Sequence, residues 1–490
     1  MASEEKLKIC LATSEFAPFA KTGGLADVTS ALSAYLHRNG HEVCAVMPHF
    51  SRIDKGGYDI KPVEQLQDLT VRIGPWDVEY SVNAVKLPRT SLEVFLIDCP
   101  VLYGRESIYT NDDDEHLRFL LLTRASFEIC QRLGFAPDIF SAHDWQTALM
   151  PLYLRTIYAW DKLFADTRSV LTIHNIGYQG VFPSSALNDL TLGDAVHHLH
   201  QDDLQHGRIN FLKTGVLYAN RITTVSPRYA KEIQGPEYGV GLDGLLRERR
   251  GALVGILNGV DYEEWDPETD TLIPHNFGPG SLDGKMLCKV ELMREMSLTS
   301  SHDAPLIGIV SRLVGQKGFD LVENVLPRVL SQRHVSLAVL GSGEPRYETF
   351  FSKLQRAFPG RVSYYRGYNN RLAHWIEAGA DIFLMPSLYE PCGLNQMYSL
   401  KYGTVPVVRE TGGLADSVEM VDPRAGTGTG ILFRDYNNDG LAWALTTALN
   451  LYSNPKLWKQ IMLNGMAKDF SWDEQGAQYV SLFQELSSEP

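Results

Sequence analysis

The chain has 490 residues, of which 44% are hydrophobic and 21% charged, as is ordinary for a soluble globular protein. This length is too great for one ordinary domain and predicts two or three, each able to bury a core of its own. The formal net charge of -14 argues against nucleic acid or an anionic membrane as a partner, and no apolar run approaches the ~20 residues that span a bilayer.

The N-terminal residues 1–6 carry no apolar segment of the kind found in export signals. We therefore expect a cytoplasmic enzyme, or one of the plastid stroma if a transit peptide has been removed. The six cysteines form no Cys-x-x-Cys pair and no metal-ligand spacing with histidine, so we expect reduced, mostly buried thiols and no metal site. They are Cys10, Cys44, Cys99, Cys130, Cys288 and Cys392.

Short apolar runs rich in β-branched residues alternate with longer helical patterns, which is typical of βαβ units and a mainly parallel sheet. The predicted fold class is therefore α/β. In the first half, strands are predicted at 8–13, 42–47, 94–97, 138–142, 169–173 and 221–225, and helices at 25–38, 116–132 and 144–157.

The second half repeats this alternation. Strands are predicted at 306–311, 336–340, 362–365, 381–385 and 405–408, and helices at 319–330, 347–357, 394–402 and 414–421. Between the halves, the segment from Leu257 to Asp261 is followed by a stretch rich in proline and glycine, where we expect a hinge. Two sheets joined there would face each other across a cleft, with ligands outside the carboxyl ends of the strands.

The hexapeptide Thr-Gly-Gly-Leu-Ala-Asp occurs twice, at residues 22–27 and 411–416, each time between a predicted strand and a predicted helix. Paired glycines let a backbone approach a ligand closely, and a helix N-terminus offers unsatisfied N–H groups with a partial positive charge. One copy is more often only a turn. Two copies favour a pair of Rossmann-like halves that each bind an anion such as a phosphate.

Two cations follow the first strand of the second half. Arg312 and Lys317 lie between the strand at 306–311 and the helix at 319–330. Arginine binds phosphate with a bidentate fork and lysine acts as a compact charge, so the pair suits a diphosphate. The alternative is that both are ordinary surface cations of a loop.

Glu390 follows the strand at 381–385, and Cys392 and Gly393 lie between it and the next helix. A carboxylate in this position either accepts hydrogen bonds from sugar hydroxyls or is simply an acid near a helix N-terminus. A carboxylate that binds sugar hydroxyls, next to N–H groups that bind phosphate, would recognise a nucleotide sugar. We favour that interpretation.

Polar side chains also end two strands of the first half. His143 and Asp144 follow the strand at 138–142, and His174 and Asn175 follow the strand at 169–173. A single histidine is more often structural than catalytic. Two at strand ends favour an active site, because α/β folds keep their ligands there.

Taken in chain order, these motifs resemble those of the glycogen and starch synthases. The resemblance covers nearly the whole chain and rests on residues 21–28, 143–145, 172–175, 258–261, 312 with 317, 390–394 and 411–414. It implies a GT-B fold, in which two Rossmann-like domains face each other across a deep cleft. It further implies that glucose passes from ADP-glucose to the non-reducing end of an α-1,4-glucan (glycogen, starch or a malto-oligosaccharide), with retention of configuration and without a cofactor or metal.

The resemblance also implies a division of the chain and a set of roles. Residues 1–257 would form the acceptor-side domain and 258–473 the nucleotide-sugar domain, with a helix at 474–490 packing back on the first. Arg312 and Lys317 would hold the diphosphate and stabilise the charge that develops as ADP leaves. Glu390 would contact the glucose hydroxyls, together with the backbone of Cys392, Gly393 and Leu394.

In the first domain, the resemblance places Lys21 and the amides of Gly23 and Gly24 near the phosphates. The carbonyl of His174 would lie near the anomeric centre, and Asp144 near the acceptor. Because no enzyme nucleophile is evident, a front-face mechanism that rests on positioning and electrostatics is expected. Further substrate contacts are expected from Asp27, His143, Asn175, Asn258, Tyr398 and Thr411.

Two positions depart from the wider pattern. Tyr398 stands where many retaining GT-B enzymes carry a second glutamate, although the synthases generally lack it. Asn395 stands where many bacterial members have threonine, which leaves the acceptor preference open. The alternative functions are a UDP-glucose-dependent GT-B transferase with a small acceptor, and a catalytically silent glucan-binding relative.

Overall fold

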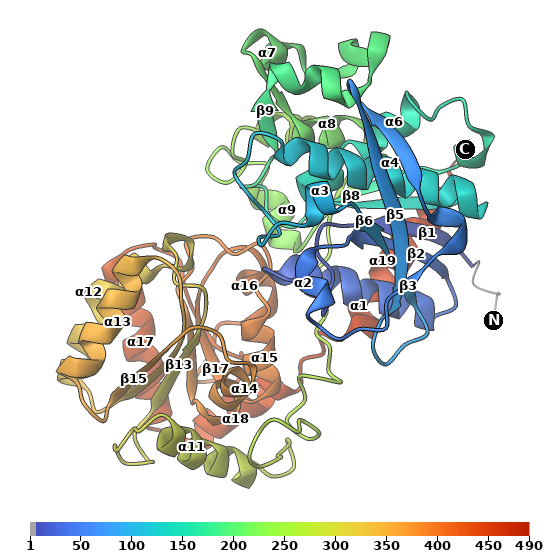
Figure 1. The fold of residues 1–490 in the computed structure, drawn as a ribbon. Coiled ribbons are helices and arrows are strands. Elements are labelled where there is room, and N and C mark those ends of the chain that lie inside the picture. Colours follow the sequence, from blue (N-terminus) through green and yellow to red (C-terminus); the bar gives the residue numbers. More distant parts are fainter. Residues whose placement is uncertain (1–5, 490) are drawn as a thin grey trace. The chain divides into compact units, whose positions relative to one another are not determined.

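The computed structural model describes residues 6–489, which divide into two compact units (Figure 1). The first unit comprises residues 6–225, 230–259 and 472–489, and the second comprises 226–229 and 260–471. Apart from the short segment 226–229, the chain passes between the units after Gly259 and after Ser471, two residues from each of the boundaries expected after 257 and 473. Residues 1–5, which belong to the segment expected to carry no export signal, lie outside the described residues.

A mainly parallel sheet forms the centre of the first unit. In the described part of the chain its strand order is β12-β11-β8-β7-β1-β2-β6-β5-β3, with β4 paired to β5. Pairing is parallel from β12 to β6 and antiparallel beyond it. The strands are β1 (Lys8–Ala12), β2 (Glu42–Pro48), β3 (Lys61–Pro62), β4 (Leu69–Ile73), β5 (Trp76–Lys86), β6 (Glu93–Asp98), β7 (Ile139–His143), β8 (Arg168–Ile173), β11 (Arg221–Thr224) and β12 (Leu253–Gly255).

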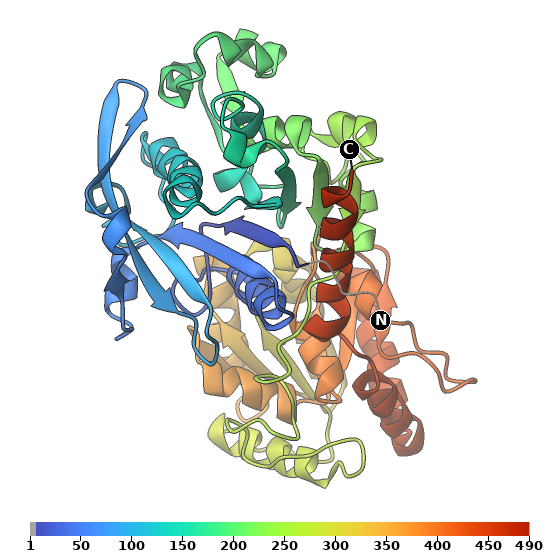
Figure 2. The same cartoon turned by 90° about the vertical axis from the view of Figure 1, so that its right-hand side faces the viewer.

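Helices cover both faces of this sheet, which explains why its strands are continuous apolar runs. Ile9 and Leu11 of β1 pack in one cluster with Leu32 of α1 and Phe483 of α19, the dark red C-terminal helix of Figure 2. Helix α4 packs on β1 and β2. The α-helices of this unit are α1 (Gly24–Arg38), α2 (Ser51–Asp54), α3 (Pro100–Tyr103), α4 (Glu115–Leu133), α5 (Asp144–Thr147), α6 (Met150–Arg155), α7 (Gln201–Gln205), α8 (Phe211–Tyr218), α10 (Asp243–Glu248) and α19 (Trp472–Ser487), and α9 (Pro227–Glu232) spans the boundary at residue 229. The strands β9 (Val181–Pro183) and β10 (Arg208–Asn210) pair antiparallel in a small separate sheet.

The second unit is built on a parallel sheet whose described strands have the order β15-β14-β13-β16-β17-β18. Those strands are β13 (Leu306–Val310), β14 (Ser336–Gly341), β15 (Val362–Arg366), β16 (Ile382–Met385), β17 (Val405–Arg409) and β18 (Ile431–Phe433). The helices are α11 (Asp283–Glu295), α12 (Phe319–Gln332), α13 (Pro345–Ala357), α14 (Asn370–Gly379), α15 (Asn395–Lys401), α16 (Gly412–Ser417), α17 (Asn438–Tyr452) and α18 (Pro455–Met466).

Both sheets share one topology. Numbered along each unit, the parallel strands run 3-2-1-4-5-6, which is the Rossmann order, and the first unit adds one more strand at the end of this series. The order reverses between β1 and β7 in the first unit and between β13 and β16 in the second. Ligands of such sheets bind at this reversal, outside the carboxyl ends of the strands.

Two predicted helices are shorter than expected. The helix predicted at 144–157 is two short helices, α5 and α6, because Pro151 lacks the N–H that a continuous helix requires and instead lies in the first turn of α6. The helix predicted at 414–421 ends at Ser417, because Val418 is extended and Glu419 accepts hydrogen bonds from Thr429 and Gly430. Within residues 6–489, none of the helices has the length and apolar character needed to cross a bilayer.

Candidate active site residues of the two units

In the second unit, the reversal of strand order brings a lysine and a glutamate together. Lys317 follows β13 and Glu390 follows β16, and Lys317 Nζ lies 2.6 Å from Glu390 Oε2. Ser387 Oγ donates to the same oxygen at 3.0 Å. The Glu390 side chain is only 7% exposed, so this ion pair is largely shielded from water. Glu390 Oε1 accepts no hydrogen bond from the described residues, which leaves it for a further donor.

The loops that carry these two side chains are packed backbone against backbone. Gly318 adopts a φ of 77°, and a Cβ at this position would overlap the carbonyl oxygen of Pro386. Leu388 N donates to Gln316 O at 2.9 Å, which joins the same two loops. A glycine is therefore required at 318 both by its dihedral angles and by the close approach.

The remaining predicted residues of this unit surround the same loops. Arg312 is exposed on the loop after β13, and its guanidinium makes no ion pair with a described residue. Asn395 Nδ2 donates to Val310 O at 3.1 Å, which ties the start of α15 to the end of β13. Tyr398, also on α15, stacks on Trp265 with ring centroids 4.0 Å apart. Tyr398 thus packs against an aromatic side chain, while Arg312 extends into solvent.

The second copy of the repeated hexapeptide is used for packing. A Cβ on Gly412 would overlap the carbonyl oxygen of Glu390, and Gly413 N donates to the same oxygen at 3.1 Å. Thr411 is buried, and its carbonyl accepts from Leu414 N in the first turn of α16. The paired glycines here let the loop after β17 approach the loop after β16, which holds Glu390 in place. Cys392, buried at 5% exposure, and the half-buried Gly393 and Leu394 complete this loop.

The first copy has different surroundings. Gly23 immediately precedes α1, which starts at Gly24, and a Cβ on Gly23 would meet no atom within 4 Å. The loop is held by Glu15, a buried carboxylate that accepts from Thr22 N at 2.5 Å, from Thr22 Oγ1 at 2.6 Å and from Gly23 N at 3.2 Å. The Gly23 amide that was expected to face a phosphate is therefore directed at Glu15 in this structure.

Lys21 and Asp27 flank this loop and form an ion pair of 2.7 Å. Their side chains are 49% and 31% exposed, so the pair itself adds little to stability. Lys21 is therefore a half-exposed, ion-paired cation on the loop that also contains Gly23.

Two buried histidines meet at the end of β7 and β8. His143 Nδ1 and His174 Nε2 are 3.0 Å apart, and Ser141 Oγ lies 3.1 Å from His143 Nε2. Burial lowers the pKa of His174 to about 3 and holds the pKa of His143 well below its ordinary value. Both imidazoles are therefore neutral near pH 7, and one donates its ring hydrogen to the other.

Asp144 is positioned by the strand ends on both sides. Its Oδ1 accepts from His174 N at 2.7 Å and from Asn175 N at 3.3 Å, which fixes the backbone of the loop that follows β8. Burial raises the pKa of Asp144 to about 7, against the effect of these two donors, and the charge of Glu15 adds to the rise. Asp144 also has a φ of 55°, a left-handed conformation in which aspartate is tolerated better than most residues.

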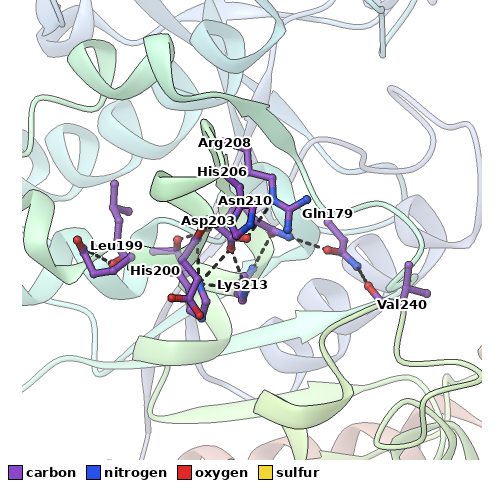
Figure 3. A network of polar contacts seen from close by, with 12 residues as sticks. Gln179, Leu199, His200, Asp203, His206, Arg208, Asn210, Lys213 and Val240 are labelled. Atoms are coloured by element: carbon purple, nitrogen blue, oxygen red, sulfur yellow. Dashed lines mark hydrogen bonds and ion pairs between the residues drawn. The ribbon is translucent and has the colours of Figure 1, made fainter.

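A polar network continues from this loop into the β9–β10 region (Figure 3). Gln179 Nε2 donates to Val240 O at 2.9 Å, and Gln179 Oε1 accepts from Asn210 Nδ2 at 2.6 Å. Asn210 Oδ1 caps α8 through Lys213 N, and Lys213 Nζ pairs with Asp203 at 2.8 Å. The loop of His174 and Asn175 is thus anchored beyond its own strand.

Asn258 differs from the other predicted residues of the first unit. It is buried at 4% exposure, yet its Oδ1 finds no hydrogen-bond partner within the described chain. A buried amide oxygen without a partner costs free energy unless a ligand or water satisfies it. The predicted role of Asn258 as a substrate contact is consistent with this orphaned oxygen.

Glu15, Ser387 and Ser141 were not predicted as site residues from the sequence. Glu15 had a signal in the sequence, because it is an acid placed between a buried strand and the glycine pair at 23 and 24. Glu15 accepts from two backbone amides only because of the conformation of the loop, and the sequence pattern does not specify that conformation. The serines had no signal, since a single hydroxyl near a strand end is common.

Comparisons with known proteins cover both units. Residues 8–248 match the family described as starch synthase catalytic domain, and residues 295–462 match glycosyl transferases group 1. Glycogen synthase 1 of Geobacter sulfurreducens is 43% identical over 98% of this chain and 96% of its own length. The glycogen synthase of Koribacter versatilis is 44% identical, over 98% of each chain.

A solved structure gives the same result for the fold. The catalytic domain of starch synthase IV from Arabidopsis thaliana, bound to ADP and acarbose, matches with a TM-score of 0.91 and 32% identity. The match covers 99% of this chain and 100% of that one. The predicted α/β fold with two Rossmann-like domains is confirmed by this likeness.

Proposed function

This chain belongs to the glycogen and starch synthase family, and on that premise we propose that it is a retaining hexosyltransferase that uses ADP-glucose to extend an α-1,4-glucan at its non-reducing end. The observation that carries the proposal is the buried pair of Lys317 and Glu390 at the strand-order reversal of the second unit. A cation for a diphosphate and an acceptor for sugar hydroxyls are what a nucleotide sugar requires.

On the donor side, we assign Lys317 and Arg312 to the diphosphate and Glu390 to the glucose. Lys317 is already oriented by Glu390, so its ammonium is positioned before a ligand arrives. Cations fixed in advance stabilise the negative charge that grows on the departing ADP without reorganising during the reaction. The ADP in the related starch synthase structure supports this choice of donor.

On the acceptor side, we assign the carbonyl of His174 to the anomeric centre and Asp144 to the attacking hydroxyl. A retaining transfer passes through a state with positive charge on the sugar, which a carbonyl oxygen stabilises and an imidazolium would oppose. The low pKa values of His143 and His174 keep both rings neutral, which suits this role. Catalysis then rests on orientation and electrostatics, since no side chain has to form a covalent intermediate.

The test compares labelled ADP-glucose with UDP-glucose as donor, each with and without glycogen, and with EDTA as a control for a metal requirement. We expect incorporation from ADP-glucose only when glycogen is present, and no effect of EDTA. Preferential use of UDP-glucose over ADP-glucose would replace the proposal by the alternative transferase. Glycogen binding without any transfer would favour the silent relative.

A further inference from the structure

Three of the six cysteines, distant in sequence, meet inside the first unit. Cys10 lies on β1, Cys44 on β2 and Cys130 on α4. Their Sγ atoms all lie within 4.8 Å of one another. The three side chains are 0%, 3% and 0% exposed, so the cluster is closed to bulk solvent. The spacing of these cysteines in the sequence does not reveal the cluster, because they come from three separate elements.

The fold holds these thiols on one face of the sheet. Cys10 and Cys44 are directly opposite each other in the parallel pairing of β1 and β2. Their neighbours Ile9, Leu11 and Val43 pack toward α1 and α19, and side chains alternate along a strand. Cys10 and Cys44 therefore point to the other face, where α4 packs and supplies Cys130. Two strands and a helix position the three cysteines, so the thiols lie close together without a rearrangement of any loop.

The charge environment of the cluster is set by the thiols themselves. Within the described chain, no histidine, aspartate or glutamate joins the three cysteines as a further ligand. Burial raises the pKa of Cys10 and of Cys130, while hydrogen bonds from these two thiols lower the pKa of Cys44. No cationic side chain contributes to any of these shifts.

Burial and the lack of a nearby cation favour some thiol-binding ions over others. Thiophilic ions such as Cu⁺ and Zn²⁺ bind cysteine sulfur as thiolate. Three thiolates around either ion carry a net negative charge, which is costly in an apolar interior without a cation nearby. A trivalent centre bound by three thiolates is neutral, so burial does not penalise it in the same way.

We propose that Cys10, Cys44 and Cys130 form a binding site for a trivalent group 15 oxyacid, represented by arsenite. As(OH)₃ condenses with the three thiols: three As–O bonds and three S–H bonds break, three As–S bonds form, and three water molecules leave. Arsenic stays trivalent throughout, so no oxidant or reductant takes part. The product uses all three sulfurs of the cluster, and it is neutral, as the buried surroundings require.

The experiment uses the full-length protein, reduced with a phosphine because dithiols would compete for arsenic. One sample is incubated folded with arsenite and a second is refolded in its presence, so that access to the buried cluster does not decide the result. After desalting, arsenic per chain is measured by elemental analysis, and its neighbours by X-ray absorption. We expect one arsenic per chain with three sulfur neighbours and no oxygen, and no retained zinc in a parallel sample.

Variants locate the site. Cys44→Ala and Cys130→Ala should each lose the three-sulfur signature and release arsenic on desalting, with thermal melts recorded to show that they fold. Cys99→Ala and Cys288→Ala remove buried thiols outside the cluster and should retain one arsenic per chain. The proposal is overturned by no retention in either wild-type sample, by two sulfurs with one oxygen, by zinc retained in place of arsenic, or by unchanged retention in Cys44→Ala.

Discussion

Glu390 and Lys317 illustrate how single residues near the candidate site depend on each other. The two side chains are buried to a large extent and share one hydrogen bond of 2.6 Å. Truncating either leaves the partner's charge shielded from water and unpaired, which costs more than loss of an exposed pair. Their effect on activity must therefore be separated from an effect on folding.

We predict that Lys317→Ala and Glu390→Ala each lower kcat by about 100-fold or more, because each removes a group that we propose contacts the donor. Turnover of ADP-glucose with glycogen measures the effect, and circular dichroism verifies the fold. Lys468→Ala is the matched control, since Lys468 forms an ion pair with Glu419 at the surface of the same unit. Near-normal turnover in both site variants would contradict the roles assigned here.

Asp144 gives a prediction about pH. Its pKa is raised to about 7, mainly by burial, so the folded protein holds a proton that the unfolded chain releases near pH 3.8. The resulting stabilisation is complete below the unfolded value and is lost as pH rises through about 7. Between pH 5 and 8, the wild type should therefore lose stability relative to Asp144→Asn, by an amount on the order of a few kcal/mol.

The measurement is chemical denaturation of both proteins at several pH values. The pH profile of activity provides a second readout, because a limb near pH 7 that depends on Asp144 should vanish in the variant. Parallel stability curves for the two proteins across this range would show that Asp144 ionises at an ordinary pH.

At the scale of elements, the repeated hexapeptide shows that one sequence serves two structural purposes. The copy before α1 leaves open space at Gly23, whereas the copy before α16 is packed against the carbonyl of Glu390. The repeat correctly predicts two strand–loop–helix units, but it does not reveal that a side chain at Gly23 would meet open space whereas one at Gly412 would overlap a carbonyl oxygen. The difference arises because the loop after β16 packs against the second copy, and the residues of that loop are not part of the repeat.

Matched substitutions test this difference. Gly412→Ala introduces a side chain at a φ of 43° that also meets the Glu390 carbonyl, and should destabilise the protein by at least about 2 kcal/mol. Gly23→Ala occupies open space at an extended φ of -159° and should leave the melting temperature nearly unchanged. Thermal melts of the two variants suffice, and equal destabilisation would refute the distinction.

Most parallel strands were predictable within one or two residues, because strands buried on both faces are continuous apolar runs. The hairpin of β4 and β5 was not predicted, since its half-exposed pattern is weaker than that of the central strands. At the site, charged residues after strands were predictable from the rule that ligands bind at carboxyl ends. Glu15 and the cysteine cluster were not, because their contacts join segments that only the folded chain brings together.

For the whole molecule, the path of the chain matters as much as the two sheets. After the second unit, the chain returns at Trp472 and forms α19 within the first unit. This helix contributes Trp472, Tyr479 and Phe483 to the core cluster that contains β1 and α1. The first unit is therefore completed only by the last residues of the chain, so its stability depends on a segment encoded far from the rest of it.

Phe483→Ala tests this dependence. Phe483 is 0% exposed, and its truncation should destabilise the first unit by about 3–5 kcal/mol. Trp443→Ala on α17 is the control, because Trp443 is 50% exposed and its loss should cost little. Hydrogen exchange read by mass spectrometry locates the effect: protection should fall in peptides of β1 and α1 and stay unchanged in those of β13 and α12. Because α19 shares a core cluster with β1 and α1, whereas β13 and α12 share another, a loss of protection spread evenly over both units would contradict the assignment of α19 to the first.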